Sequence, residues 1–148
     1  MSEKLAGKRA IVTGGATGIG YGIAKRFVAE GALVIITDID AQGGTSAAES
    51  LGDNCQFLHH DVSVPSQWDA VFAHAKKHFS GLDIMVNVAG VTLMGTIEDI
   101  DVETWDKTMA INVRSCFLGC QGAIKLMKTN SQETKGGAII NMASVSAV

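Results

Sequence analysis

The chain has 148 residues, of which 47% are hydrophobic and 18% are charged, enough apolar material for the core of one soluble domain. The formal net charge of −3 gives no positive field for a nucleic acid, and no apolar run approaches the roughly 20 residues of a membrane helix. The charged N-terminus does not resemble a signal peptide, and three cysteines without a C-x-x-C pair fit a reducing compartment. We therefore expect a cytoplasmic protein with neither nucleic acid nor membrane as a partner.

Five short apolar runs predict β-strands, at residues 10–12, 33–36, 56–58, 84–86 and 138–140. Each run is continuously apolar and does not alternate with polar residues. This pattern is typical of parallel strands that are covered by helices on both faces.

Helical spacing of apolar residues separates these runs. A helix is expected between the first two strands, with Gly31 as its left-handed C-cap, and another after Ser63 as N-cap, with Pro65 in its first turn. The longest apolar stripe consists of Trp105, Met109, Val113, Cys116, Phe117, Cys120, Ile124 and Met127. With right-handed crossovers, the alternation predicts an α/β fold with a Rossmann-type doubly wound parallel sheet, truncated after the fifth strand.

A glycine-rich loop, Thr13-Gly14-Gly15-Ala16-Thr17-Gly18-Ile19-Gly20, lies between the first strand and the first helix. Free backbone N–H groups and the helix dipole favour an anion such as a diphosphate there. Gly14 would make the tight turn, Gly18 would allow close approach of the diphosphate, and Gly20 would allow close helix packing. The spacing G-x-x-x-G-x-G differs from G-x-G-x-x-G and lacks the Gly-Lys-Ser/Thr of a P-loop, so a purely structural turn remains the alternative.

Asp38 follows Gly20 by 18 residues, at the end of the second expected strand. There its carboxylate can accept hydrogen bonds from an adenosine ribose. The alternative is that Asp38 or Asp40 caps the next helix, a role that Asp40 fits better because it immediately precedes that helix. A carboxylate at position 38, with uncharged Ala16 and Ile39 nearby, predicts NAD in preference to NADP.

Five short motifs along the chain resemble, in order and spacing, those of the short-chain dehydrogenase/reductase family: Thr13-Gly14-x-x-x-Gly18-Ile19-Gly20, Asp61-Val62, Asn87-Val88-Ala89-Gly90, Asn112 and Ile140-Asn141-Met142-Ala143-Ser144. The resemblance implies an NAD-dependent oxidoreductase that acts on an alcohol or ketone. It also implies a homo-oligomer, a tetramer, paired through the long helix that carries Phe117. The cofactor-binding residues implied are Gly14, Thr17, Gly18, Ile19, Gly20, Asp38, Ile39, Asp61, Val62, Asn87, Ala89 and Gly90.

The resemblance assigns Asp61 to the adenine amino group and the Val62 backbone N–H to the adenine ring; a plain surface aspartate is the alternative for Asp61. The small residues Ala89 and Gly90 would let the strand end pass beneath the cofactor. Val88 stands where the family has a second asparagine. This substitution puts in doubt the support that the asparagine side chain would give to the sheet.

Two residues are expected to serve catalysis. In similar proteins the residue matching Asn112 distorts its helix so that a backbone carbonyl holds a water of the proton relay; a satisfied polar core residue is the alternative. Ser144 matches the serine that hydrogen-bonds the substrate oxygen, with Ser146 as a nearby competitor.

The family's catalytic tyrosine and the lysine four residues later find no match after Ser144. Tyr21 and Lys25 have that spacing, but they lie beside the diphosphate turn, and we regard the match as accidental. An apolar edge strand would also be left uncovered. We therefore expect a single NAD-binding domain over residues 1–148 that lacks the family's C-terminal strands and helices, has its Tyr/Lys pair beyond Val148, and is inactive alone. Two alternatives remain open: a non-catalytic dinucleotide-binding module that ends at Val148, and an S-adenosyl-dependent methyltransferase.

No metal site is expected. His74 and His78 are four residues apart, but they accompany lysines on an expected solvated face without a carboxylate. Cys116 and Cys120 are expected to be core thiols. The pair His59-His60 is expected to pack at a strand end.

Overall fold

Five parallel strands form one sheet in the computed structural model, which describes residues 3–92, 95–131 and 136–144. The sheet order is β3-β2-β1-β4-β5. The strands are β1 (Arg9–Thr13), β2 (Leu33–Asp38), β3 (Cys55–His59), β4 (Ile84–Asn87) and β5 (Ala138–Asn141). Each predicted apolar run lies inside one of them, so the predicted parallel α/β sheet is confirmed.

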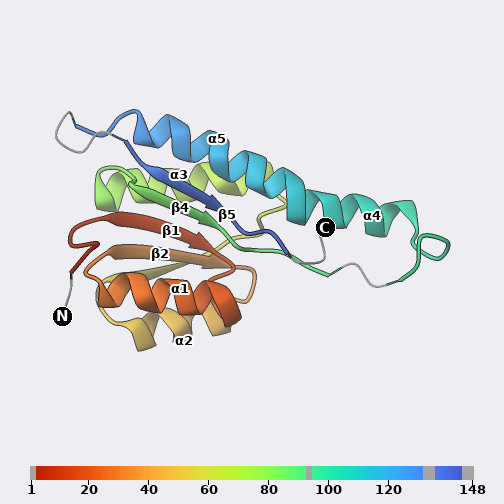
Figure 1. Ribbon diagram of the computed structural model, residues 1–148, viewed down its shortest axis with the longest axis horizontal. Helices are drawn as coiled ribbons and strands as arrows, with labels where there is room; N and C mark the ends of the chain where they lie inside the picture. The colour runs from red at the N-terminus through yellow and green to blue at the C-terminus, as the bar shows by residue number, and fades with distance from the viewer. Residues whose placement is uncertain (1–2, 93–94, 132–135, 145–148) are drawn as a thin grey trace.

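Helices cover both faces of the sheet (Figure 1). Helices α1 (Gly18–Ala29) and α2 (Ala41–Leu51) lie on one face, and α3 (Pro65–Phe79) and α5 (Ser115–Met127) lie on the other. In β1, β2 and β4 the side chains on both faces are therefore buried, whereas those of β5 at the sheet edge are mostly exposed. On the first face the buried side chains include Val12, Val34, Ile36 and Val86, and on the second Ile11, Ile35 and Met85.

From β1 the chain adds β2 and β3 towards one edge of the sheet, and from β4 it adds β5 towards the other edge. The order of the strands therefore reverses between β1 and β4, which are parallel neighbours. In doubly wound folds, ligands bind in the crevice outside the carboxyl ends of the strands at such a reversal. The carboxyl ends of β1 and β4 are Thr13 and Asn87, which adjoin the glycine loop and the Val88-Ala89-Gly90 segment. The topology thus places two of the sequence motifs side by side.

Local signals set the helix ends, with one correction. Asp40 caps α2 by accepting the Gly43 N–H at 3.0 Å, and Gly31 takes a left-handed φ of +87° after α1, as predicted. Ser63 does not cap α3: Val64 holds the N-cap position before Pro65. The Ser63 hydroxyl and backbone N–H both donate to the Asp61 carboxylate instead, which closes a local turn.

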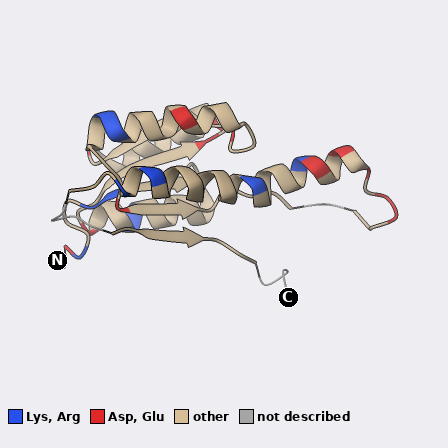
Figure 2. Ribbon diagram, turned by 90° about the horizontal axis from the view of Figure 1, so that it is seen from above, with Lys and Arg blue, Asp and Glu red and all other residues tan. Residues whose placement is uncertain are grey.

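One long helical segment runs through α4 (Val102–Met109), a π-helical stretch η1 (Ala110–Arg114) and α5. In Figures 1 and 2, α4 projects beyond the end of the sheet. The buried residues of α5 are Ser115, Gly119, Ala123 and Leu126, and the first three are small, which lets the helix pack closely against α3 and β4.

The predicted apolar stripe is mostly on the outside of this segment. Trp105, Met109, Val113, Phe117 and Ile124 are between 37% and 60% exposed. The prediction of core thiols was wrong, since Cys116 and Cys120 are only partly buried. Within the described ranges, every helix is too short or too polar to cross a membrane.

Candidate functional site

The glycine loop connects β1 to α1 by a turn that only glycine fits at two positions. Gly14 has a φ of +65°, and Gly18 has a φ of +55° with open space around it. A Cβ on Gly20 would lie 2.0 Å from the carbonyl oxygen of Gly14, so a side chain there would push α1 away from the loop. The expected roles of Gly14 in the turn and of Gly20 in helix packing agree with this geometry, and the approach of a diphosphate at Gly18 stays a prediction.

The first turn of α1 offers backbone donors. Thr17 precedes the helix with extended backbone and makes no side-chain capping bond, and the first turn has no acidic residue. The side chain of Ile19 is 63% exposed. An uncapped helix N-terminus with open space in front of it is suited to an anion such as a diphosphate.

Thr13 joins the loop to the neighbouring strand end. Its buried hydroxyl oxygen accepts the backbone N–H groups of Val88 at 3.0 Å and Ala89 at 3.1 Å. A Cβ on Gly14 would lie 3.0 Å from the Cα of Ala89, so the two segments touch. The side chain of Val88 packs into the core on the α1 face, which gives it an apolar role in place of the family's amide.

Asp38 ends β2 with its carboxylate against the glycine loop. One oxygen accepts the Ala16 N–H at 3.1 Å, and the other accepts the Asp40 N–H at 3.0 Å. Asp38 therefore does not cap α2, a role that Asp40 fills. The side chain of Ile39, beside it, is 64% exposed.

Asp61 follows β3 and is held by its own turn. Ser63 donates two hydrogen bonds to Oδ1, at 2.9 Å from its N–H and 2.7 Å from its hydroxyl. These bonds lower the pKa of the Asp61 carboxyl, and the charge of Lys107 lowers it further, so the group is ionised at neutral pH. The Asp61 backbone N–H donates to the Gln67 side chain at 2.8 Å.

A hollow of about 320 Å³ brings these strand ends together. Of the predicted cofactor residues, seven line it, from the glycine loop and the ends of β2, β3 and β4: Gly14, Asp38, Ile39, Asp61, Val62, Ala89 and Gly90. The other lining residues are His60, Val91, Lys107 and Ile111. Carboxylates at two points and apolar walls between them suit a nucleoside better than a purely charged ligand.

Asn112 lies in the π-helical stretch, which departs from the regular helix that its apolar stripe predicts. Its side chain is exposed and clamps the loop after β4, accepting the Val91 N–H and donating to the Val91 carbonyl, both at 2.8 Å. Its own backbone carbonyl accepts the Cys116 thiol at 3.5 Å. The alternative of a buried core asparagine was therefore wrong.

Asn87 and Ser144 lie outside the hollow. Asn87 is 3% exposed and donates to the Asn141 side chain at 2.8 Å, which ties β4 to β5. Ser144 is exposed and follows β5, whose path continues beside β4 through the bond from Met142 N–H to Asn87 O at 2.9 Å. Its competitor Ser146 lies outside the described residues.

Sequence reasoning missed two residues of the hollow and undervalued a third. Lys107 and Ile111 precede Asn112 on the same helical segment, and their spacing of four residues, which places them on one helix face, was the available signal. His60 was expected only to pack, yet it lines the hollow and is 1% exposed. In the part of the chain that the structure describes, no three His, Cys, Asp or Glu side chains form a group able to hold a metal.

The spacing match at Tyr21 and Lys25 has a structural explanation. The Tyr21 hydroxyl lies 3.1 Å from the Ser50 hydroxyl, so it joins α1 to α2. Both helices lie on the sheet face opposite α5 (Figure 1). Tyr21 is thus used in helix packing.

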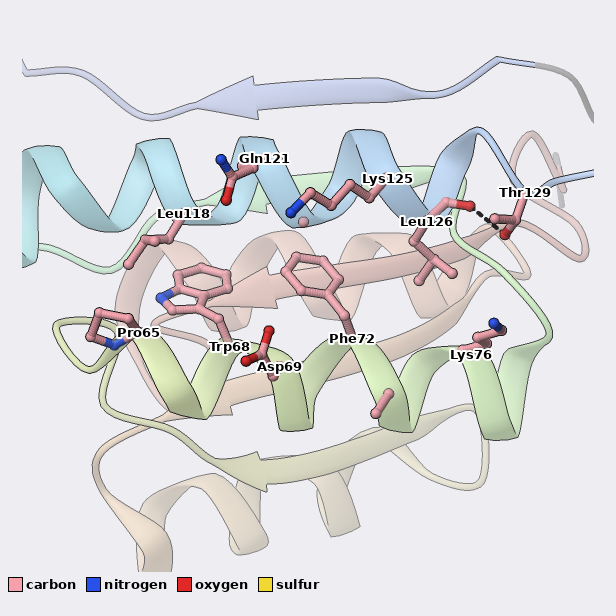
Figure 3. A pocket seen from close by; sticks show the side chains of 12 residues that line it. Pro65, Trp68, Asp69, Phe72, Lys76, Leu118, Gln121, Lys125, Leu126 and Thr129 are labelled. Carbon is pink, nitrogen blue, oxygen red and sulfur yellow. Dashed lines mark hydrogen bonds between the residues drawn. The ribbon is translucent and has the colours of Figure 1, made fainter.

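A second hollow, of about 300 Å³, lies between α3 and α5 (Figure 3). Trp68 and Phe72 form its floor as stacked rings with centroids 5.8 Å apart, and Lys76 and Lys125 lie at its rim. None of its lining residues belongs to the first hollow or to the predicted site. We therefore place the candidate site at the strand ends.

Comparison with known proteins identifies the family of the chain. The model of the short chain dehydrogenase family matches residues 8–148. A 3-beta-hydroxysteroid dehydrogenase of Comamonas testosteroni is 42% identical over 99% of this chain and 56% of its own. A 3-alpha-(or 20-beta)-hydroxysteroid dehydrogenase of Mycobacterium bovis is 40% identical over 98% of this chain and 54% of its own. An NADP-dependent (R)-specific alcohol dehydrogenase of Lentilactobacillus kefiri is 40% identical over 98% of this chain and 57% of its own.

The chain belongs to the short chain dehydrogenase family. It spans slightly more than half the length of these curated relatives. The relatives named are dehydrogenases, but they differ in the substrate or the cofactor that their names state. The choice of cofactor and substrate must therefore be argued from the residues of this chain.

Proposed function

We propose that this chain is the NAD-binding half of an oxidoreductase that interconverts an alcohol and a ketone. The observation that supports this most directly is the Asp38 carboxylate, hydrogen-bonded to the glycine loop at Ala16 and lining one hollow with Asp61. The Gly20 contact supports it as well, because the absence of a Cβ there lets the N-terminus of α1 pack closely against the glycine loop, as a dinucleotide-binding turn requires.

The predicted cofactor residues have separate binding roles in this proposal. Backbone N–H groups at Gly18 and Ile19 bind the diphosphate, Asp38 accepts the ribose hydroxyls, and Asp61 accepts the adenine amino group. The remaining predicted residues, Thr17, Ile39, Val62, Asn87, Ala89 and Gly90, shape or flank this path. When bound, the nicotinamide dinucleotide supplies the hydride donor or acceptor.

The substrate side of the site involves Ser144 and Asn112. Ser144 would donate a hydrogen bond to the substrate oxygen as negative charge develops there. Asn112 would keep the loop after β4 in place through its two bonds to Val91, while its backbone carbonyl holds a water for proton transfer. The family's tyrosine and lysine have no counterpart at Tyr21 and Lys25, so we assign proton transfer to a Tyr-x-x-x-Lys pair beyond position 148, with residues 1–148 binding cofactor without turnover.

Two measurements test this function. NADH should bind to the protein and S-adenosylmethionine should not; the reverse would support a methyltransferase. In a longer form that carries a Tyr-x-x-x-Lys pair after residue 148, Ser144→Ala should lower turnover with an alcohol or ketone by about 100-fold or more, with NADH affinity nearly unchanged.

The matched control is Ser146→Ala in the same longer form. A larger loss with that variant would show that the substrate serine was misassigned. Cofactor binding without any dehydrogenase activity in the longer form would favour the non-catalytic binding module.

A further inference from the structure

A buried imidazole lies between the two carboxylate-bearing strand ends. His60 is 1% exposed, directly precedes Asp61, and donates its backbone N–H to the Asp38 carbonyl at 2.9 Å. It also lines the hollow that contains both carboxylates. Any change in the position of His60 is thus transmitted to Asp38 and Asp61.

The His60 side chain contacts one residue on each side. Its Nδ1 lies 3.1 Å from the hydroxyl oxygen of Thr37, the fully buried residue that precedes Asp38. Its ring meets the ring of Trp68 at 89°, with centroids 4.5 Å apart. Nε2 has no hydrogen-bond partner among the described residues.

Trp68 continues the connection to the adenine side of the site. It is 3% exposed, and its indole N–H donates to the Val62 carbonyl at 2.9 Å. In Figure 3 it points from α3 into the space below α5. The contacts Thr37, His60, Trp68 and Val62 therefore link the residue before Asp38 to the residue after Asp61.

The protonation state of His60 follows from its surroundings. Burial lowers its pKa to about 4, so the imidazole is neutral at pH 7 and carries one N–H. A buried N–H without an oxygen partner is costly, whereas an N–H directed at an aromatic face is weakly bonded. The perpendicular contact brings the Trp68 ring next to the imidazole, and if Nε2 carries the hydrogen, Nδ1 is free to accept the Thr37 hydroxyl.

A purely space-filling role would not need these polar atoms. Phenylalanine has nearly the same shape and could make the same perpendicular contact with Trp68. Burying a polar ring in this place costs desolvation free energy unless the ring is hydrogen-bonded. The Thr37 hydroxyl provides that hydrogen bond.

We infer that His60, as its Nε2–H tautomer, is a positioning residue that sets the separation between Asp38 and the Asp61-Val62 turn, and so determines how tightly the adenosine half of the dinucleotide binds. This role rests on the proposed NAD site. It assigns to His60 an effect on adenine recognition without contact between its side chain and the cofactor.

The tautomer is tested by NMR of the ¹⁵N-labelled protein at pH 7. Nε2 of His60 should be protonated and Nδ1 should not, and Thr37→Val should shift the Nδ1 resonance. Protonation at Nδ1 alone, or at both nitrogens, would overturn the inference.

The effect on recognition is tested by titration with NADH and with its deamino analogue, in which an oxygen replaces the adenine amino group. His60→Phe should weaken NADH binding about tenfold, roughly the loss of one hydrogen bond, and should weaken analogue binding much less. The preference for NADH over the analogue therefore shrinks. Thr37→Val keeps the imidazole and its packing and should reduce the preference in the same direction.

His59→Phe is the matched control, because His59 is exposed and lies outside the hollow, and it should leave both affinities unchanged. Equal weakening of both ligands, or no weakening, in His60→Phe and Thr37→Val would overturn the role of His60. Failure of the unmodified protein to bind NADH would instead overturn the proposed function.

Discussion

Asp38 illustrates how a single residue is fixed by its neighbours before any ligand binds. Its two oxygens accept N–H groups from Ala16 and Asp40, so the carboxylate is held at the strand end and faces the hollow. The sequence suggested this role from spacing alone. The structure adds the bond to Ala16, which ties Asp38 to the glycine loop.

The predicted packing of His59-His60 at the strand end is confirmed for His60, which is buried against Trp68, but was wrong for His59, which is exposed. Two adjacent histidines before Asp61 carry no pattern that separates a buried imidazole from an exposed one. His59 is exposed and His60 is buried, because the side chains alternate at the strand end and only one faces α3 and Trp68. The partner on Thr37 is 23 residues earlier, and no local rule would have paired them.

The buried His60 makes stability depend on pH. Its pKa is about 4 in the folded protein against 6.5 for an ordinary histidine, so below pH 6.5 the unfolded chain takes up a proton that the folded chain does not. Stability should therefore be lost as the pH falls from 6.5 to 4, by about 3 kcal/mol in total. Urea unfolding measured at a series of pH values should show this loss in the unmodified protein and a smaller one in His60→Phe. Identical slopes for the two proteins would contradict the buried, neutral imidazole.

At the scale of elements, β1, β2 and β4 were predictable because burial on both faces leaves their interiors almost entirely apolar. The residues at which the strands end were harder to predict. The strands extend through Thr13, Asp38 and Asn87, polar residues whose backbones or side chains still pair across the strand ends. Composition alone would exclude such residues from a buried strand.

The helix around Asn112 could be anticipated only in part. An asparagine on an apolar stripe indicates a local departure from regular α-helix. The contact of the π-helical stretch with Val91, 21 residues before Asn112, could not be predicted from local sequence. The N-terminus of α3 was misjudged for a similar reason. Ser63 is bound to Asp61, so it is not available to cap the helix.

The junction between β1 and α1 gives a prediction with a matched control on one helix. Gly20→Ala should weaken NADH binding at least tenfold and destabilise the fold by about 2 kcal/mol, because the new methyl group would overlap the Gly14 carbonyl. Gly22→Ala has open space around it and should stabilise α1 by up to about 1 kcal/mol without loss of binding. Thermal unfolding and NADH titration of both variants check this. Equal behaviour of the two would show that the close packing at Gly20 is not required.

At the scale of the whole molecule, the outer face of the long helical segment carries exposed apolar side chains that the candidate site does not explain. Trp105, Met109, Val113, Phe117 and Ile124 recur along it, and α5 shows few charged residues in Figure 2. Exposed apolar patches of this kind mark protein interfaces. We propose that this face pairs two copies of the chain, with a homotetramer as the complete assembly.

Phe117→Asp tests this interface, since a charge at 60% exposure costs a free monomer little but cannot be buried between two copies. The unmodified full-length protein should sediment as an oligomer at micromolar concentration, and the variant should shift to smaller species. Lys125→Asp, a change to another exposed residue of α5 outside the apolar stripe, is the control for added negative charge and should have less effect. A monomer in the unmodified protein would contradict the interface.

The family does not fix the choice between NAD and NADP, since one relative is an NADP-dependent enzyme. We argue the choice from the residues of this chain. A 2′-phosphate would meet the Asp38 carboxylate at close range, with Ala16 and Ile39 uncharged beside it. Lys107 is the one cation among the described residues that line the hollow, and its charge acts on Asp61. We therefore expect no compensation at the ribose.

Parallel calorimetric titrations of the protein with NADH and NADPH test this account most directly. NADH should bind at least 100-fold more tightly at moderate salt, because like charges brought together cost several kcal/mol. Asp38→Ala should erode the preference, and Ile39→Arg added to it should move the preference towards NADPH. Equal affinity of the unmodified protein for the two cofactors would contradict the assignment of Asp38 to the ribose, and with it the proposed NAD site.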